Sequence, residues 1–288
     1  MFIKLIESKA LFSQMDDMAS TVLITGASQG IGKATALLFA RKGYNIVLAA
    51  RQPDRLSAVA QEIQSLGRAA LAVPTDVRDS EQVNALVSKA LNEYGSIDVL
   101  INNAGIYISG AVEKFSLSDW HQAIDTNLWG YIHTIHALLP HFVERGTGTI
   151  VNVNSIGGKV PLPYLTPYST SKFALTGLTE ALHSELSPKG IHVCGIYPNL
   201  IESSFLERAI FRGVDEQDTQ ARREQVETIL KAPVEKPEDV AQAIWDAVER
   251  KQAEVIVGSA NLSVATNRLF PSLMQWILRK TFKLKDTD

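Results

Sequence analysis

Tyr168 and Lys172 have the types and the spacing of a proton-transfer pair. Residues four apart on a helix project from the same face, so the lysine ammonium would stand beside the phenol. A neighbouring positive charge favours the phenolate and lowers the pKa of the tyrosine, which could then exchange a proton near neutral pH. Ser155 follows the apolar run 149–153, and at the end of that strand its hydroxyl would lie beside the phenol. Together the three groups suit the interconversion of an alcohol and a carbonyl.

The Tyr–Lys spacing by itself also arises by chance on amphipathic helices, so a second motif is needed to support the chemistry. Residues 21–25 predict a buried strand, residues 26–32 form the turn Gly-Ala-Ser-Gln-Gly-Ile-Gly, and residues 33–40 predict a helix. Glycines let the backbone approach a pyrophosphate, and the free N–H groups at a helix start bind it. The turn therefore predicts a nucleotide site, with the spacing G-x-x-x-G-x-G instead of G-x-G-x-x-G.

Together with Asn102–Gly105, Ser155, Tyr168 and Lys172, this turn resembles the short-chain dehydrogenase/reductase family over about residues 20–258. Several spaced motifs in the right order make the resemblance specific. It implies an NADP-dependent oxidoreductase that transfers a hydride between a nicotinamide and a carbonyl or alcohol.

The resemblance implies four catalytic residues, Asn127, Ser155, Tyr168 and Lys172. Ser155 would polarise the carbonyl oxygen, and Tyr168 would give or take the proton. Lys172 would tune Tyr168 and bind the cofactor ribose. In the family the matching asparagine distorts its helix, so that its backbone carbonyl holds a water that touches the lysine. Asn127 could otherwise serve only as a hydrogen-bonding residue inside that helix.

The end of the second strand predicts NADP(H) in preference to NAD(H). Ala50 stands where NAD-preferring members of the family carry an acid, and Arg51 stands where NADP-preferring members carry a base. A guanidinium can clamp a 2′-phosphate, and no carboxylate at Ala50 would repel it. Gln29 occupies a second position where some NADP-dependent members carry a base, so that supporting charge is missing. An ordinary solvated role for Arg51 is the alternative.

Further cofactor contacts follow from the resemblance along the rest of the chain. Asp76 and Val77 match an adenine-contacting pair, and Asn103–Gly105 match the loop that flanks the cofactor. After the sixth strand the family usually has P-G-x-x-x-T, and this chain has Asn199 and Ser203 in place of the glycine and threonine. Asparagine can adopt the left-handed conformation, and the serine keeps the hydroxyl. The predicted cofactor-binding residues are Gly26, Ser28, Gln29, Gly30, Ile31, Gly32, Arg51, Asp76, Val77, Asn103, Ala104, Gly105, Tyr168, Lys172, Pro198, Ile201 and Ser203.

Strands and helices alternate along most of the chain. This alternation predicts a single-domain α/β fold of Rossmann type, with a doubly wound parallel sheet of about seven strands in the order 3-2-1-4-5-6-7. The dinucleotide-binding and catalytic domain would span residues 20–258, with a substrate lid at 203–233. Residues 1–19 form an N-terminal extension that is expected to be loosely ordered. Strands are predicted at 21–25, 45–50, 69–73, 97–102, 148–154, 191–197 and 254–257, and helices at 30–43, 54–66, 79–94, 118–143, 166–187 and 237–250.

Composition favours an enzyme of the cytoplasm and excludes several other classes. The net charge of −3 provides no basic field for nucleic acid. The single cysteine, Cys194, cannot form an intramolecular disulfide, which fits a reducing compartment. The sequence contains no run of 18 apolar residues, so no transmembrane helix is predicted. His133 and His136 have no carboxylate at a metal-binding spacing, so no metal site is predicted.

The substrate is predicted only as a class. The apolar stretch 160–165, with Ile106 and Tyr107, would line a pocket for a small apolar ketone, aldehyde or secondary alcohol, although packing residues give the same pattern. A 3-oxoacyl thioester reductase is the alternative within the enzyme class. A catalytically silent cofactor-binding regulator is the alternative outside it, and the complete catalytic set argues against that role. The helices near 118–143 and 166–187 are expected to pair in a homodimer or homotetramer.

The C-terminal tail, residues 259–288, mixes bulky apolar residues with bases. A basic amphipathic helix that carries tryptophan can lie in an anionic membrane interface. A helix folded over the substrate pocket or against another subunit is favoured over such peripheral membrane contact. The residues that follow helical spacing in the tail are Leu269, Leu273, Trp276, Ile277 and Lys280.

Overall fold

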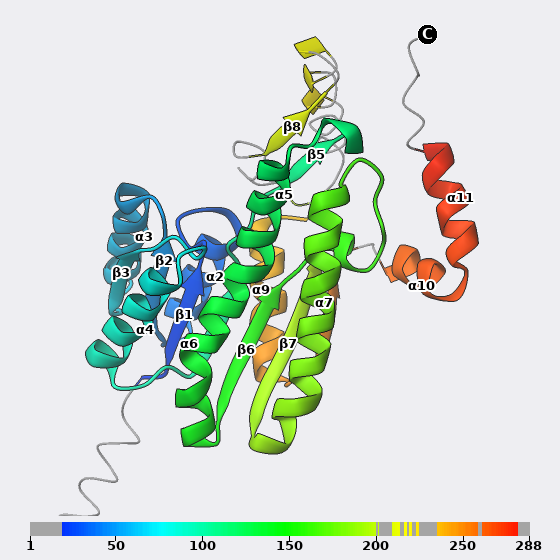
Figure 1. Cartoon of the computed structure of the whole chain (residues 1–288). Coiled ribbons are helices and arrows are strands. Elements are labelled where there is room, and N and C mark those ends of the chain that lie inside the picture. The colour runs from blue at the N-terminus through cyan, green and yellow to red at the C-terminus, as the bar shows by residue number, and fades with distance from the viewer. Residues whose placement is uncertain are drawn as a thin grey trace, which may run out of the picture.

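The computed structural model describes residues 19–199, 201, 209–213, 216–217, 219–220, 223–224, 235–258 and 261–281. Its centre is a parallel sheet of seven strands in the order β3-β2-β1-β4-β6-β7-β9, covered by helices on both faces (Figure 1). Counted along the chain, this is the predicted order 3-2-1-4-5-6-7, so the Rossmann-type fold is confirmed. The strand bounds lie within two residues of the predicted ones. They are β1 Thr21–Thr25, β2 Asn45–Ala50, β3 Ala70–Pro74, β4 Val99–Asn102, β6 Gly148–Val153, β7 Ile191–Pro198 and β9 Glu254–Val257.

Alternate residues of each strand serve two separate cores, as expected for a sheet that is covered on both faces. Val22 and Ile24 of β1 face helices α2, α3 and α9, whereas Leu23 between them faces helices α4, α6 and α7. The covering helices are α2 Gly30–Arg41, α3 Pro53–Ser65, α4 Ser80–Tyr94, α6 Gly130–Arg145, α7 Thr166–Leu186 and α9 Pro237–Glu249.

Local sequence explains several helix ends. Asp79 caps α4 by accepting hydrogen bonds from the backbone N–H groups of Glu81 and Gln82. Ser116 and Asp119 form a reciprocal capping box at the start of α5, Leu117–Ile124. Gly146 ends α6 with a φ of 65°, a left-handed conformation that favours glycine.

The structure differs from the predicted elements in three places. The helix predicted over 118–143 is divided by a π-helical turn, Asp125–Trp129, between α5 and α6. A two-stranded parallel sheet pairs β5, Ile108–Gly110, with β8, Ile210–Arg212, and β8 lies within the segment predicted as a lid. The tail forms two helices, α10 Asn261–Leu269 and α11 Pro271–Thr281. Short 3₁₀ turns occur at Val112–Lys114, Ile156–Gly158 and Ser187–Lys189.

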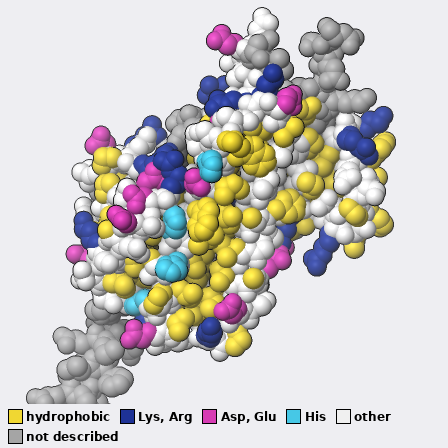
Figure 2. Space-filling model, in the orientation of Figure 1, with side chains coloured by type: hydrophobic (Ala, Val, Ile, Leu, Met, Phe, Trp, Pro, Cys, Tyr) yellow, Lys and Arg dark blue, Asp and Glu magenta, His cyan; other side chains and the backbone are white. Residues whose placement is uncertain are grey.

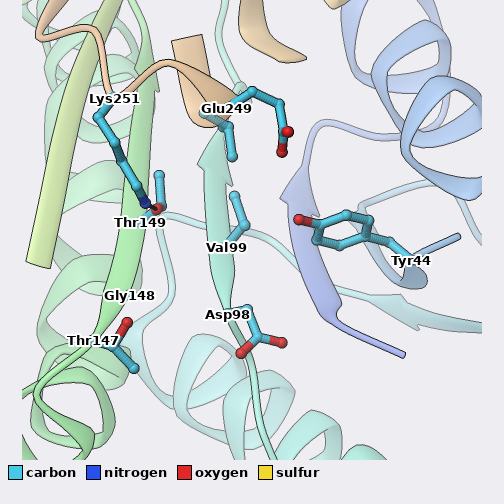
Figure 3. Close-up of a pocket in the computed structure, with 9 residues that line it drawn as sticks. Tyr44, Asp98, Val99, Thr147, Gly148, Thr149, Glu249 and Lys251 are labelled. Atoms are coloured by element: carbon cyan, nitrogen blue, oxygen red, sulfur yellow. Dashed lines mark hydrogen bonds between the residues drawn. The ribbon is translucent and has the colours of Figure 1, made fainter. Parts of the chain in front are cut away.

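The two edges of the main sheet have different character. The glycine turn, Arg51, the loop after β4, Ser155 and the end of β7 all follow the carboxyl ends of parallel strands, so they gather at one edge. A hollow at the opposite edge is lined by residues that precede or begin strands, among them Tyr44, Asp98 and Lys251 (Figure 3). No residue of the predicted catalytic set lines that hollow. None of the helices in the described part of the chain combines the length and apolar character that crossing a bilayer requires.

Candidate active site

Helix α7 brings Tyr168 and Lys172 together as the sequence predicts. Both side chains are buried, and the lysine Nζ lies 5.9 Å from the centre of the Tyr168 ring. The ammonium donates a hydrogen bond to the backbone carbonyl of Val153 at 3.2 Å and lies 5.4 Å from the centre of the Tyr131 ring. The pair therefore faces the end of β6, where the third predicted group is found.

Ser155 follows β6 and begins a 3₁₀ turn that places its hydroxyl against the phenol. The serine Oγ accepts a hydrogen bond from the backbone N–H of Gly157 at 3.1 Å, and the serine side chain is hydrogen-bonded to Tyr168. A Cβ on Gly157 would lie 3.1 Å from Cε1 of Tyr168, so this glycine lets the turn approach the ring closely. Sequence reasoning did not single out Gly157, although its position two residues after Ser155 is a readable signal.

Burial dominates the electrostatics of the pair. It raises the pKa of Tyr168 to about 12, and the hydrogen bond with Ser155 offsets only part of that rise. Burial also lowers the pKa of Lys172 to about 7. The sequence-based expectation of a tyrosine pKa lowered by the lysine is therefore wrong. At neutral pH the phenol is protonated, and the lysine is divided between its charged and neutral forms.

Asn127 lies in the π-helical turn and is completely buried. Its Oδ1 accepts from the backbone N–H of Ile106 at 2.8 Å, and its Nδ2 donates to the carbonyl of Ile106 at 3.0 Å and to Ser171 Oγ at 3.1 Å. Ser171 in turn donates to the carbonyl of Tyr168 at 2.6 Å. The asparagine thus ties the loop after β4 to the catalytic helix, and the distorted helix agrees with the family pattern. The water relay remains a prediction.

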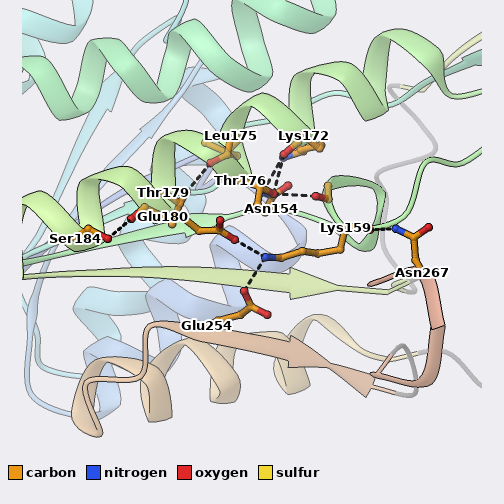
Figure 4. A network of polar contacts seen from close by, with 11 residues as sticks. Asn154, Lys159, Lys172, Leu175, Thr176, Thr179, Glu180, Ser184, Glu254 and Asn267 are labelled. Atoms are coloured by element: carbon orange, nitrogen blue, oxygen red, sulfur yellow. Dashed lines mark hydrogen bonds and ion pairs between the residues drawn. The ribbon is translucent and has the colours of Figure 1, made fainter. Parts of the chain in front are cut away.

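A polar network between the Ser155 turn and α7 was not predicted from the sequence. Asn154 donates to the carbonyl of Lys172 at 3.1 Å and to Thr176 Oγ1 at 2.9 Å, and Thr176 donates to the carbonyl of Gly158 at 3.0 Å (Figure 4). These bonds fix the Ser155 turn against α7. The position of Asn154 directly before the serine was the available signal.

Lys159 extends that network to the edge of the sheet. Its ammonium contacts Glu180 of α7 and Glu254 of β9, each at 2.7 Å (Figure 4). Although burial alone would lower it, these two hydrogen bonds raise the pKa of Lys159. The carbonyl of Lys159 accepts from Asn267 Nδ2 of α10 at 2.8 Å. The serine turn is therefore held on one side by α7 and on the other by the C-terminal helices.

The glycine turn has the shape that a pyrophosphate requires. Gly26 and Gly30 have φ values of 66° and 54°, and a Cβ on Gly32 would lie 2.3 Å from the carbonyl oxygen of Gly26. No side chain among the described residues caps the start of α2, and its first turn carries no acid. Free N–H groups at a helix start bind anions, so these residues fit a dinucleotide. Ser28 and Ile31 lie in the same turn and helix start.

The loop after β4 is fastened to the glycine turn. Thr25 Oγ1 accepts from the backbone N–H groups of Asn103 and Ala104 at 3.0 and 3.1 Å. Asn103 Nδ2 returns a bond to the carbonyl of Thr25 at 3.0 Å. A Cβ on Gly105 would lie 4.0 Å from Lys172 Nζ, so this loop passes close to the lysine of the predicted pair. The structure thus brings the two predicted cofactor loops together.

Arg51 follows β2 and is exposed, and the structure adds a second base that the sequence reading missed. Arg55 on α3 donates a hydrogen bond to Gln29 Oε1 of the glycine turn. Its place in the first turn of α3, directly after the segment that carries Arg51, was the available signal. Two guanidinium groups therefore lie near the end of β2, Arg51 in the loop after the strand and Arg55 in the first turn of α3.

Asp76 and Val77 occupy the loop after β3. Arg78 lowers the pKa of Asp76 through hydrogen bonds to both carboxylate oxygens, the shortest at 2.5 Å, and Arg51 contributes to the same shift. Val77 is buried against α6, where a Cβ on Gly130 would lie 2.6 Å from Val77 Cγ2. Asp76 is therefore close enough to Arg51 for their charges to interact, and the pair predicted to contact the adenine follows β3, the neighbour of β2.

The loop after β7 is described only in part. Pro198 ends β7, and Ile201 forms an isolated parallel bridge with Glu235. Ser203, predicted to contact the cofactor, lies outside the described residues, as do residues 1–18 and most of the predicted lid at 203–233.

Two aromatic side chains lie in series next to Tyr168. Tyr107 lies 5.4 Å from Tyr168 between ring centres, and Phe211 of β8 lies 6.2 Å from Tyr107. Arg212 holds β8 in place, because its Nη2 and Nε bond the two carboxylate oxygens of Asp119 at 2.7 and 3.1 Å. Tyr107 was predicted to line the pocket, whereas the contributions of Phe211 and Arg212 were not.

The predicted pocket stretch 160–165 has two roles. Val160 is buried, and together with Leu162 it packs with Met274 and Leu278 of α11. The carbonyl of Tyr164 accepts from the backbone N–H of Gly110 at 2.8 Å, which joins this stretch to β5. Packing thus accounts for part of the apolar pattern.

Among the described residues no group of three or more potential metal ligands occurs.

Comparison with known proteins identifies the family. Residues 20–213 match the family model for short chain dehydrogenases. The chain belongs to this family. It is 32% identical over 259 residues to the ketoacyl reductase HetN of Nostoc sp., covering 88% of this chain and 84% of that protein. The resemblance predicted from the sequence motifs is confirmed.

Solved structures agree in fold and in cofactor type. A short-chain dehydrogenase/reductase from Burkholderia phymatum in complex with NAD superposes with a TM-score of 0.81 at 25% identity, covering 90% of this chain and 95% of that chain. A short-chain dehydrogenase from Sphingobium yanoikuyae in complex with NADPH gives a TM-score of 0.73 at 30% identity, covering 93% and 97%. The protein is therefore a short-chain oxidoreductase that acts on a carbonyl or alcohol with a nicotinamide cofactor.

Proposed function

We propose that the protein is an NADP(H)-dependent reductase of small apolar ketones or aldehydes, which also oxidises the corresponding secondary or primary alcohols. In reduction the hydroxyls of Ser155 and Tyr168 hold the carbonyl oxygen, and Tyr168 gives its proton to that oxygen. Lys172 and Ser155 stabilise the phenolate that remains until the proton is replaced. When bound, the nicotinamide would supply or accept the hydride. The single observation that carries the proposal is the buried Ser155–Tyr168–Lys172 constellation beside a fitting nucleotide cradle.

The proposed direction of reduction rests on the preference for NADP(H), because cellular NADP pools are kept largely reduced, and the protonated phenol is compatible with that direction. Because the pKa of Tyr168 is raised to about 12, the side chain is protonated at neutral pH. A protonated phenol is the form that gives a proton to a developing alkoxide, whereas oxidation needs the phenolate.

The preference for NADP(H) is supported by the charges at the end of β2. Arg51 is exposed, Arg55 is hydrogen-bonded to the glycine turn through Gln29, and Ala50 leaves no carboxylate at the strand end. Two guanidinium groups suit a 2′-phosphate, since charge-assisted bonds to phosphate are stronger than neutral ones.

The apolar character of the substrate is supported by Tyr107, which lies against Tyr168, and by Phe211, which lies against Tyr107. The Tyr107 ring contacts both Tyr168 and Phe211, and the Phe211 side chain is 8% exposed. Removing apolar surface from water is favourable, so such walls select apolar substituents on the carbonyl.

A panel of ketones, aldehydes and alcohols, assayed for oxidation of NADPH and NADH, tests the proposal. We expect turnover of apolar ketones with a higher kcat/KM for NADPH than for NADH. Equal or greater efficiency with NADH would overturn the cofactor preference, and turnover of charged carbonyls alone would overturn the substrate class.

A 3-oxoacyl thioester is the second candidate substrate, because the relative from Nostoc is named a ketoacyl reductase. An acetoacetyl thioester included in the panel separates the two candidates. A kcat/KM for the thioester that exceeds the values for simple ketones by a hundredfold or more would favour the thioester.

We also propose a symmetric dimer or tetramer that uses the outer face of α6 and α7. Trp129, Val143 and Phe173 are 48%, 46% and 40% exposed on this side of the molecule, where Figure 2 shows hydrophobic side chains gathered in the middle of the face. Contiguous exposed apolar patches favour protein contacts, and twofold symmetry would bring the same patch of each subunit together.

A further inference from the structure

The C-terminal helices α10 and α11 form a hairpin whose outer side is apolar and exposed. Of the twelve large hydrophobic residues that are exposed in the described part of the chain, six belong to this hairpin, with exposed fractions between 37% and 77%. Figure 1 shows α11 standing at the margin of the molecule, beyond α7. The outer face is formed by Leu262, Leu269, Phe270, Leu273, Trp276 and Ile277.

The inner side of the hairpin is already occupied. Met274 and Leu278 are buried in a cluster with Ile156 and Val160 of the catalytic turn, and Asn267 donates to the carbonyl of Lys159 at 2.8 Å. These contacts hold the hairpin on the enzyme. The hairpin is therefore docked on the enzyme through its inner side. The outer face stays exposed although the hairpin is docked.

Helical geometry gathers the outer residues of α11 into one stripe. Leu273, Trp276, Ile277 and Lys280 follow the spacing i, i+3, i+4, i+7 and lie on one side of the helix. The buried Met274 and Leu278 occupy the adjacent side. Lys280 Nζ lies 5.9 Å from the centre of the Trp276 ring, so the charge stands beside the apolar stripe.

The charge of the hairpin is one-sided. Residues 261–281 include Arg268, Arg279 and Lys280 and no aspartate or glutamate, whereas the whole chain has a net charge of −3. All three bases are exposed. Dark-blue and yellow side chains accordingly lie side by side at the right margin of Figure 2.

We propose that the outer face of the α10–α11 hairpin binds the interface of an anionic lipid bilayer. Apolar side chains with a tryptophan would enter the boundary between headgroups and acyl chains, and the bases would contact lipid phosphates. A second copy of the chain fits less well. Pairing this face with itself would oppose like charges, since the hairpin contains no carboxylate to neutralise its bases.

Sedimentation of the full-length protein with vesicles tests the proposal. We expect binding to vesicles of mixed phosphatidylglycerol and phosphatidylcholine, weak binding to pure phosphatidylcholine, and loss of binding at high salt. Leu273→Gln with Trp276→Gln should lower the partition coefficient at least tenfold, because both apolar anchors are removed. Arg279→Gln with Lys280→Gln should lower it about fivefold for each base.

Two matched variants serve as controls. Leu66→Gln removes a leucine of similar exposure at the end of α3, and Lys189→Gln removes an exposed lysine that follows α7. Both controls should bind vesicles as the parent does. The outer-face variants should keep the parent's circular dichroism and its turnover of a water-soluble ketone.

Three results would overturn the proposal. The first is that the parent protein binds the anionic vesicles no better than pure phosphatidylcholine vesicles, or that its binding to the anionic vesicles does not weaken at high salt. The second is equal partition coefficients for the parent and the Leu273/Trp276 double variant. The third is a smaller assembly, measured by light scattering, for that double variant, which would make the outer face a contact between subunits. Because partition is measured without turnover, failure of the proposed enzymatic function would not affect this test.

Discussion

Replacing Lys172 with methionine should change how the stability of the protein depends on pH. Burial lowers the pKa of this lysine to about 7 in the folded chain, whereas an unfolded lysine titrates near ~10.4. Between pH 7 and 9 the folded lysine loses its proton and the unfolded lysine keeps it. The unfolded state then binds more protons, so the free energy of unfolding rises with pH.

The magnitude follows from the two pKa values. A folded pKa of about 7 and an unfolded pKa of ~10.4 give a gain of ~2 kcal/mol in the free energy of unfolding from pH 7 to pH 9. Lys172→Met removes the titrating group while it keeps a side chain of similar length. The difference in unfolding free energy between parent and variant should therefore change by that amount over the two pH units.

Urea unfolding, followed by tryptophan fluorescence at a fixed protein concentration at pH 7, 8 and 9, measures this change. Lys159→Met is the matched control. Hydrogen bonds to Glu180 and Glu254 outweigh burial and raise the pKa of Lys159, so that residue stays charged in both states over this range. Its variant should lower stability equally at each pH. If the parent and Lys172→Met had parallel pH profiles, the argument that burial perturbs the catalytic lysine would be refuted.

Three further predictions concern the cofactor, the assembly and the tail. Arg51→Asp should lower the preference for NADPH over NADH at least tenfold, since charge-assisted bonds are worth ~1.5–3 kcal/mol. Arg68→Asp, a charge reversal at an exposed arginine beyond α3, should leave that preference unchanged, and an unchanged ratio in Arg51→Asp would contradict the clamp. Light scattering at micromolar concentration should give a dimer or tetramer, and a strict monomer would be inconsistent with the α6–α7 interface. Deletion of residues 262–288 should raise the KM or alter the substrate range, because Met274, Leu278 and Asn267 no longer support the Ser155 turn. Unchanged kinetics would exclude that support.

The sheet and the proximity of Tyr168 to Lys172 were predictable because their signals are local. Strands such as Thr21–Thr25 are short apolar runs bounded by glycine, and Tyr168 and Lys172 have a helical spacing that places them together in any helix. Alternating units of this kind leave few topologies, and the carboxyl ends of the strands then collect the motifs.

The parts that were missed depend on contacts between distant segments. The strand β8 exists only through its pairing with β5, a hundred residues earlier, and through the bond from Arg212 to Asp119. The pattern of Asp125–Trp129 alone reads as ordinary helix, and the distortion there was expected only from the family resemblance. The bonds of Asn127 to Ile106 accompany its π-helical turn.

The sign of the Tyr168 pKa shift was also beyond the sequence. The spacing of Tyr168 and Lys172 predicts their proximity, but the degree of burial follows from packing in three dimensions. In the folded chain burial is the largest cause of the shift at both residues. Proximity alone therefore gave the wrong direction.

The most direct test of the account compares the parent with Tyr168→Phe, which keeps the ring and removes the hydroxyl. NADPH binding, measured by fluorescence titration, should remain within a few fold of the parent. Reduction of the best ketone of the panel should fall by ~10²–10⁴, the usual contribution of a positioned acid or base. Full activity in Tyr168→Phe, with the cofactor bound as in the parent, would contradict the assignment of Tyr168 as the proton donor.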